Sequence, residues 1–118
     1  MKTIISLSDI SKNYDAFIID QWGVMHDGKN AYDNAIKCVE SLFKDKKKLS
    51  IISNSSKKND LTISKLLELG FDPKYFIDVV TSGEMIWNAL SSGSDQDFND
   101  LGKKCFFISD DSNYNEKI

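Results

Sequence analysis

The chain has 118 residues, a net charge of −3, 41% hydrophobic residues and 28% charged residues, which is typical of one globular domain or part of one. This acidic balance gives no electrostatic reason to expect binding to nucleic acid or to an anionic membrane, and we expect neither partner. The sequence has neither a long apolar run nor a signal peptide, so we expect a cytoplasmic protein. All 15 basic residues are lysines, so a phosphate site here would use lysine, backbone N–H groups and hydroxyls.

Short apolar runs alternate along the chain with segments of helical periodicity. In chain order we expect a strand at 16–19, a helix over about 32–46, a strand at 49–52, a helix over about 60–69, a strand at 77–80, a helix from 82, a polar loop or weak helical turn over 91–102, and a strand at 105–108. The apolar runs lack polar alternation, which is typical of parallel strands buried on both faces. The pattern predicts an α/β fold with a Rossmann-like, doubly wound parallel sheet.

Two residues are expected to set helix ends. Gly70 follows the apolar stripe of the second helix and is placed to end it. Ser82 precedes the third helix and is expected to cap it, with Glu84 in the first turn.

Polar residues follow the predicted strands at the edge where parallel sheets bind ligands. Asp20 follows the first strand, and Ser53 and Asn54 follow the second. A carboxylate in this position can attack phosphorus and form an aspartyl-phosphate, while a hydroxyl and backbone N–H groups hold the other oxygens. A shared Mg²⁺ ion would reduce the repulsion between the two anions. A strand-end aspartate considered alone, however, more often only caps the following turn.

Several segments together resemble one enzyme family. Residues 14–28, which contain Asp20-Gln21-Trp22-Gly23-Val24, resemble the first motif of the haloacid dehalogenase superfamily, in its class IIA branch. Residues 51–56 resemble the second motif, and residues 69–71 and 80–84 also resemble this branch. The resemblance implies a haloacid dehalogenase-like core and a Mg²⁺-dependent phosphatase that acts through an aspartyl-phosphate. Its substrate would be a small phosphorylated metabolite, of the sugar phosphate or nucleotide class.

The resemblance also implies roles for individual residues. Asp20 would be the nucleophile and a Mg²⁺ ligand, and the backbone carbonyl of Trp22 would be a second metal ligand. Ser53 and Asn54 would bind the transferring phosphoryl group.

One residue departs from the superfamily pattern. Trp22 stands where the superfamily usually has a second aspartate, the general acid and base, and an indole cannot take that role. Asp27 and His26, in a flap over about residues 22–30, are the candidates to replace it. A simple Asp-Gly turn is the favoured interpretation of Asp27, and a flap histidine bonded to the backbone is at least as common as a catalytic one.

Other charged residues near the strand ends have simpler interpretations. Lys57 and Lys58 follow the second motif and are expected to lie at a solvated helix start, although either could stabilise phosphate charge. Asp110 and Asp111 mimic the superfamily's fourth motif but come too early in the chain, so a strand-end turn is favoured.

We expect residues 1–118 to form the N-terminal part of such a core domain, without the cap, and to have little or no turnover alone. The alternative is a non-catalytic module that binds phosphate or a partner protein, which Trp22 favours and which Asp20 and Ser53 disfavour. A third hypothesis has Asp110 and Asp111 completing a minimal, capless site. The sequence leaves open whether the chain forms a homo-oligomer.

Overall fold

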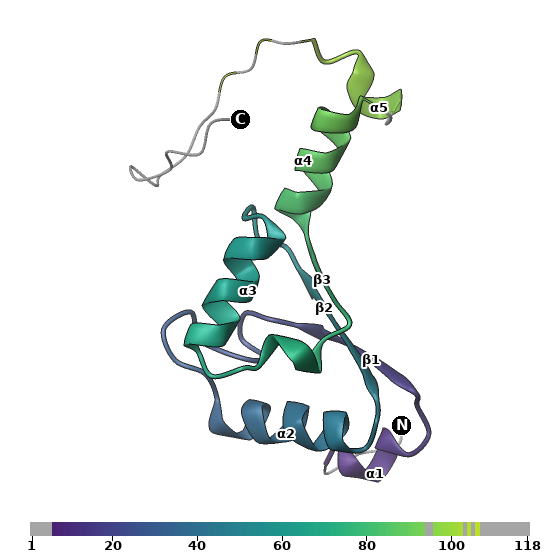
Figure 1. Ribbon diagram of the computed structural model, residues 1–118, viewed down its shortest axis with the longest axis vertical. Coiled ribbons are helices and arrows are strands. Elements are labelled where there is room, and N and C mark those ends of the chain that lie inside the picture. Colours follow the sequence, from purple (N-terminus) through teal and green to yellow (C-terminus); the bar gives the residue numbers. More distant parts are fainter. Residues whose placement is uncertain (1–5, 94–95, 103, 105, 107–118) are drawn as a thin grey trace.

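The structure is a computed structural model that describes residues 6–93, 96–102, 104 and 106. Helices and strands alternate along these residues (Figure 1). The elements are α1 (Ser8–Ser11), β1 (Ala16–Asp20), α2 (Asp33–Lys44), β2 (Lys48–Ser53), α3 (Asn59–Glu68), the 3₁₀ helix η1 (Pro73–Tyr75), β3 (Asp78–Thr81), α4 (Ser82–Ser92) and α5 (Gln96–Asn99). The order matches the predicted order up to the third helix, with α1 and η1 added.

The three strands form one parallel sheet in the order β1-β2-β3. Its register pairs Asp20 with Ile52 and Ser53 with Thr81, so the carboxyl ends of all three strands meet at one edge. Parallel strands joined by helices confirm the predicted α/β, Rossmann-like fold. The sheet therefore brings Asp20 and Ser53 to the same edge, as the sequence predicted.

The hydrophobic core lies between the sheet and helices α2 and α3, which cover the same face (Figure 1). Leu49, Ile51 and Val79 point from the strands into this layer, and all three are buried. They form one cluster with residues of the helices and loops, namely Met25, Val39, Leu42, Leu66 and Phe71. The apolar stripes read from the sequence thus pack against one face of the sheet.

The opposite face of the sheet is exposed among the described residues. Ile18 is 76% exposed and Ile52 is 55% exposed, although both belong to the apolar runs. The expectation that the strands are buried on both faces is therefore wrong for this part of the chain. The physical reason is that both crossover helices within the described residues, α2 and α3, pack on the same side.

The helix ends agree with the sequence at one position and differ at another. Gly70 has φ +93°, and the Phe71 N–H donates to the Leu66 carbonyl at 2.9 Å, so Gly70 ends α3 as predicted. The expected cap at Ser82 is wrong, because the Thr81 hydroxyl accepts the Glu84 N–H at 3.0 Å and Ser82 is the first helical residue. Thr81 takes this role because its backbone is still extended as the last residue of β3.

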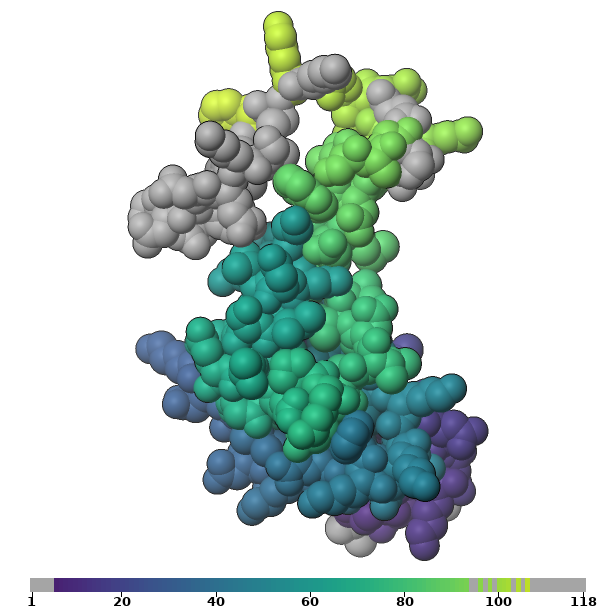
Figure 2. Space-filling model, viewed as in Figure 1, coloured from purple at the N-terminus to yellow at the C-terminus, as the bar shows by residue number. Residues whose placement is uncertain are grey.

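The last described elements extend away from the sheet. α4 continues from the carboxyl end of β3; its first turn contacts the start of α3, and its later turns extend away from the sheet (Figures 1 and 2). Within the predicted loop over 91–102, α5 forms a single helical turn. Most of the predicted strand at 105–108 lies outside the described residues, as do Asp110 and Asp111. Over the described ranges, no helix combines the length and apolarity that a membrane span requires.

Candidate functional site

A hollow of about 550 Å³ opens at the carboxyl ends of β1 and β2. Residues from three segments line it: the loop after β1, the loop after β2, and the first two turns of α3. They are Asp20, Gln21, Trp22, His26, Gly28, Ser53, Asn54, Ser55, Lys57, Leu61, Thr62 and Lys65. The hollow therefore contains Asp20, Trp22, Ser53 and Asn54, which the sequence had selected.

Asp20 is the last residue of β1 and is exposed at the edge of the sheet. Its Oδ1 accepts the N–H of Gln21 at 2.8 Å, which fixes the carboxylate at the mouth of the loop. Oδ2 has no hydrogen-bond partner within the described part of the chain, so one oxygen is held and the other is open to a ligand. A held carboxylate with one open oxygen suits both nucleophilic attack and metal coordination.

The loop after β1 forms a tight flap around one carbonyl. The Gln21 carbonyl accepts the N–H groups of Met25 at 2.8 Å and of His26 at 3.4 Å. Gly23 has φ +79° and donates to the His26 carbonyl at 2.8 Å, a backbone conformation that glycine adopts readily. Met25 is 1% exposed and belongs to the core cluster. The buried Met25 therefore anchors the flap over the sheet edge.

Trp22 is 71% exposed, although an indole is usually largely buried. It lines the hollow, and a Cβ at Gly28 would lie 3.2 Å from its Nε1. Because Gly28 has no side chain, the Trp22 indole has room to lie beside it. This arrangement presents an apolar ring to the hollow two residues after Asp20.

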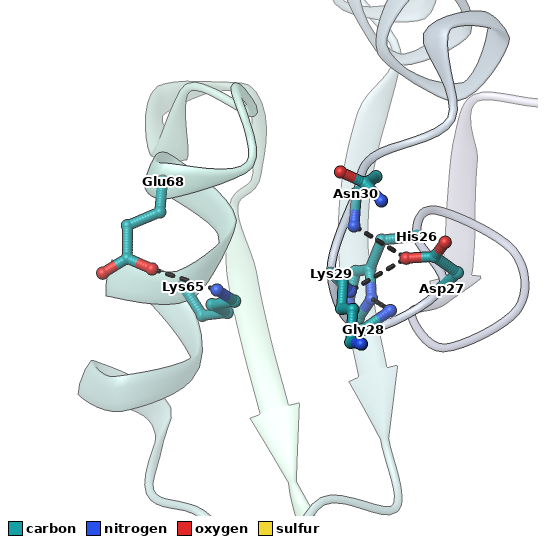
Figure 3. A network of polar contacts seen from close by, with 7 residues as sticks. All are labelled: His26, Asp27, Gly28, Lys29, Asn30, Lys65 and Glu68. Atoms are coloured by element: carbon teal, nitrogen blue, oxygen red, sulfur yellow. Dashed lines mark hydrogen bonds and ion pairs between the residues drawn. The ribbon is translucent and has the colours of Figure 1, made fainter.

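His26 is 8% exposed and also lines the hollow. Its Nδ1 accepts the Gly28 N–H at 3.0 Å, which places the proton of the neutral ring on Nε2 (Figure 3). Burial lowers the pKa of His26 below 6.5, the nearby Asp27 carboxylate opposes this, and the Lys65 ammonium adds to it. The imidazole is thus held neutral at physiological pH.

Asp27 forms a turn. Its Oδ1 accepts the N–H groups of Lys29 at 2.8 Å and Asn30 at 2.7 Å (Figure 3). These two bonds, that of Asn30 first, lower the pKa of Asp27. The Asp27 side chain is exposed and is not among the residues that line the hollow. The geometry agrees with the turn interpretation of Asp27-Gly28.

The loop after β2 is organised by its own serines. The Ser53 hydroxyl accepts the Ser55 N–H at 3.3 Å, and the Ser55 hydroxyl accepts the Lys57 N–H at 3.2 Å. Lys57 lines the hollow. The Lys58 ammonium instead lies 4.3 Å from the centre of the Trp87 ring, a cation–π contact. The sequence predicted the same role for Lys57 and Lys58, whereas the structure gives them different surroundings.

The sequence reasoning missed a second lysine in the hollow. Lys65 lies on α3 and forms an ion pair with Glu68 at 3.1 Å, across from the flap (Figure 3). Leu61 lines the same hollow one helical turn earlier. The signal was available, because Leu61 and Lys65 are four residues apart and so share one face of the helix that starts after Ser53 and Asn54. Lys57 and Lys65 therefore both line the hollow together with Asp20.

The described residues contain no group of three or more His, Cys, Asp or Glu side chains placed to hold a metal ion. Mg²⁺ does not require such a group, because it commonly keeps several waters and binds through one or two carboxylates and the substrate phosphate. The open oxygen of Asp20 and the loop carbonyls beside it are oxygen donors of the kind that Mg²⁺ prefers. The donor set is therefore compatible with Mg²⁺ but does not by itself define a metal site.

Comparison with known proteins agrees with this arrangement. The family model of haloacid dehalogenase-like hydrolases matches residues 17–117. A solved structure, a hydrolase of the haloacid dehalogenase-like family from Brucella suis 1330, is 27% identical with a TM-score of 0.66. The match covers 76% of this chain and 35% of that structure, so this chain matches about a third of its relative's length. No curated protein matches the chain. From the sheet, the strand-end site and the family match over residues 17–117, this chain belongs to the haloacid dehalogenase-like hydrolase family.

Proposed function

We propose that this chain carries the phosphoryl-transfer site of a Mg²⁺-dependent phosphatase that works through an aspartyl-phosphate on Asp20. The observation that supports this best is the hollow itself. It joins a carboxylate with an open oxygen, Asp20, to a loop of hydroxyl and amide groups, and it includes the cations of Lys57 and Lys65. Such a combination suits a dianionic phosphate ester and provides a nucleophile next to it.

The reaction would take two steps on the same carboxylate. The open oxygen of Asp20 attacks phosphorus, a phosphorus–oxygen bond to Asp20 forms, and the bond to the leaving oxygen breaks. Water then attacks phosphorus, which releases inorganic phosphate and restores the Asp20 carboxylate. During both steps Ser53 and Asn54 hold the non-bridging oxygens, and Lys57 balances their charge. Mg²⁺, when bound by Asp20 and the Trp22 carbonyl, would reduce the repulsion between carboxylate and phosphate.

Of the two candidates for proton transfer, His26 has the better position. It lines the hollow and carries its proton on Nε2, while Nδ1 is occupied by the Gly28 N–H. Asp27 faces its own turn, and its lowered pKa keeps it ionised at neutral pH, so it has no proton to give. Neutral His26 does not release its Nε2 proton near neutral pH either, and its Nδ1 is already occupied. We therefore assign to His26 a hydrogen bond from Nε2–H to a phosphoryl oxygen, with the leaving group taking its proton from water, and to Asp27 the shaping of the flap.

The exposed indole favours one of the two substrate classes. Trp22 and Leu61 present apolar surface to a hollow that is otherwise polar. A planar base can stack on an indole, which contributes about 1–3 kcal/mol per base, whereas a sugar has no such face. We therefore propose a nucleotide rather than a sugar phosphate as the substrate.

The substrate proposal is tested by fluorescence in a Trp87→Phe background, where Trp22 is the only tryptophan left. We expect AMP to quench Trp22 and to bind about tenfold more tightly than ribose 5-phosphate, as a stacking energy of this size implies. Trp22→Ala should remove the difference; because that variant has no tryptophan left, its two affinities are measured by isothermal titration calorimetry. Equal affinities for the two ligands in the Trp22-containing chain would contradict a nucleotide substrate.

The nucleophile is tested by trapping with beryllofluoride, which mimics an acyl-phosphate. With Mg²⁺ present, a bound beryllofluoride signal in ¹⁹F NMR is expected for the parent chain and is expected to be lost in Asp20→Asn. Asp15→Asn is the matched control, because Asp15 is an exposed carboxylate just before the opposite end of β1. A signal that survives Asp20→Asn would rule out Asp20 as the acceptor.

A second candidate function is a non-catalytic phosphate-binding module, which Trp22 favours because it occupies the usual acid position. The same trapping experiment separates the two. Inorganic phosphate that binds to the hollow without any beryllofluoride adduct on Asp20 would support the binding module. An adduct on Asp20 would support the phosphatase.

A further inference from the structure

We infer that the junction between β3 and α4, residues 81–84, is the positioning element of the phosphate-binding loop over residues 53–59. The inference rests on the proposed function and adds a role for four residues outside the hollow. None of Thr81, Ser82, Gly83 and Glu84 lines it. Each of the four nevertheless makes a hydrogen bond to the loop or to the first residue of α3.

Thr81 joins the two segments through one buried hydroxyl. The residue is fully buried, and its Oγ1 lies 2.7 Å from the Lys57 carbonyl oxygen and 3.1 Å from Asn59 Oδ1, to which it can donate. The same oxygen accepts the Glu84 N–H at 3.0 Å and so caps α4. The start of α4 and the end of the loop are therefore held by a single hydroxyl, whose one proton is shared between two acceptors of the loop end and whose oxygen accepts the Glu84 N–H.

Glu84 extends this connection to α3. The pattern Thr81-x-x-Glu84 is that of a capping box, in which the glutamate returns to the N–H of its own capping residue. Here Glu84 Oε2 instead accepts the N–H of Asn59, the first residue of α3, at 3.1 Å. The capping residue of α3, Lys58, supplies no side-chain bond itself. Glu84 thus satisfies the start of α3 from α4, where a negative charge also suits the helix dipole.

Ser82 and Gly83 act on the middle of the loop. The Ser82 hydroxyl donates to Asn54 Oδ1 at 2.9 Å, which leaves the donor side of that amide available to an anion in the hollow. The Gly83 N–H donates to the Ser55 carbonyl at 2.9 Å. A Cβ at Gly83 would lie 2.1 Å from the Ser56 carbonyl oxygen, so only glycine permits this approach of the two backbones.

Two readouts test the inference in the full chain. In Ser82→Ala, we expect the affinity for beryllofluoride with Mg²⁺ to fall about tenfold, the effect of one lost hydrogen bond. Ser64→Ala is the matched control, because that hydroxyl bonds within α3 to the Asp60 carbonyl and does not line the hollow. Its affinity should not change. An unchanged affinity in Ser82→Ala would overturn the role of Ser82.

The second readout needs no ligand. In Glu84→Ala, amide hydrogen exchange at Asn59 should be at least tenfold faster, whereas Glu84→Gln, which keeps an acceptor oxygen, should restore slow exchange. Equal exchange in Glu84→Ala and the parent chain would overturn the role of Glu84. If these exchange rates change as expected while the parent chain traps no beryllofluoride, the proposed function fails and the positioning of the loop stands.

Discussion

At the scale of single residues, the proposed chemistry involves Asp20, Trp22 and His26. Asp20 has an open oxygen, and His26 is buried, neutral and oriented by the Gly28 N–H. Trp22 occupies the usual acid position but has no proton to give at neutral pH. In the proposed reaction, attack by Asp20 therefore needs no further side chain, whereas neither Trp22 nor neutral His26 supplies an acidic proton to the leaving group.

The lack of a carboxylic acid at position 22 predicts a strong dependence on the leaving group. Aryl phosphates, whose leaving groups need little protonation, should phosphorylate Asp20 far faster than alkyl phosphates. Trp22→Asp should raise the rate with alkyl phosphates about 100-fold, the lower end of the usual contribution of a general acid. Rapid-quench measurement of phosphorylated protein tests this, and equal rates with both ester types in the parent chain would contradict it.

His26 predicts a pH dependence of stability. Its pKa is lowered below the ordinary value of 6.5, so the unfolded chain binds more protons than the folded chain between the two values. The free energy of unfolding should therefore decrease as the pH falls through 6.5, and stop decreasing below the folded pKa. Because His26 is the sole histidine, urea titrations of His26→Gln should lack this component. The same slope in that variant would assign the effect to other groups.

At the scale of elements, the site depends on where helices begin and end. α3 starts directly after the loop that follows β2, so its first two turns bring Leu61 and Lys65 to the hollow. At its other end Gly70 reverses the chain and directs Phe71 into the core. A backbone hydrogen bond from the Phe71 N–H to the Leu66 carbonyl fixes this end, whereas the Asn59 N–H at the start of α3 donates to the Glu84 side chain.

The left-handed conformation of Gly70 predicts the effect of adding a side chain there. At φ +93° an alanine is strained, and Gly70→Ala should reduce the free energy of unfolding by about 1 kcal/mol. The added methyl group meets only Ile36 at an ordinary 3.5 Å, so crowding contributes little. Gly70→Asn should lose less, because asparagine tolerates this region better. Urea denaturation measures both, and no loss in Gly70→Ala would contradict the assigned conformation.

At the scale of the whole molecule, the sheet is covered on one face by α2 and α3 and exposed on the other. Ile51 and Ile52 are neighbours on β2, so their side chains lie on opposite faces of the sheet. Ile51 is fully buried, whereas Ile52 is 55% exposed. Ile52 is paired with Asp20 in the parallel register, so the two side chains lie on the same, exposed face of the sheet.

This asymmetry predicts unequal effects of the same substitution at adjacent positions. Ile51→Ala should reduce the free energy of unfolding by about 3 kcal/mol, within the usual range for a buried isoleucine. Ile52→Ala should reduce it by less than about 1 kcal/mol, because little buried apolar surface is lost. Equal losses in denaturant titrations would mean that both faces are covered in solution.

The sequence by itself determined the order of the elements, the parallel sheet and the residues at the strand ends. Continuous apolar runs and helical stripes depend on local spacing, so β1 to β3 and helices α2 to α4 were placed to within a few residues, whereas α1 and η1 were not predicted. Asp20 and Ser53 could be placed together because parallel strands end at a common edge, and the structure places both in one hollow.

Only the tertiary structure decided which groups face that hollow. The sequence gives no direction for side chains in loops, so it could not separate His26 from Asp27 or Lys57 from Lys58, and it missed Lys65. The bond from the Thr81 hydroxyl to the Lys57 carbonyl and the bond from the Asn59 N–H to Glu84 also join segments far apart in the chain. Such contacts depend on how β3 and α4 pack against the loop after β2, which no local pattern records.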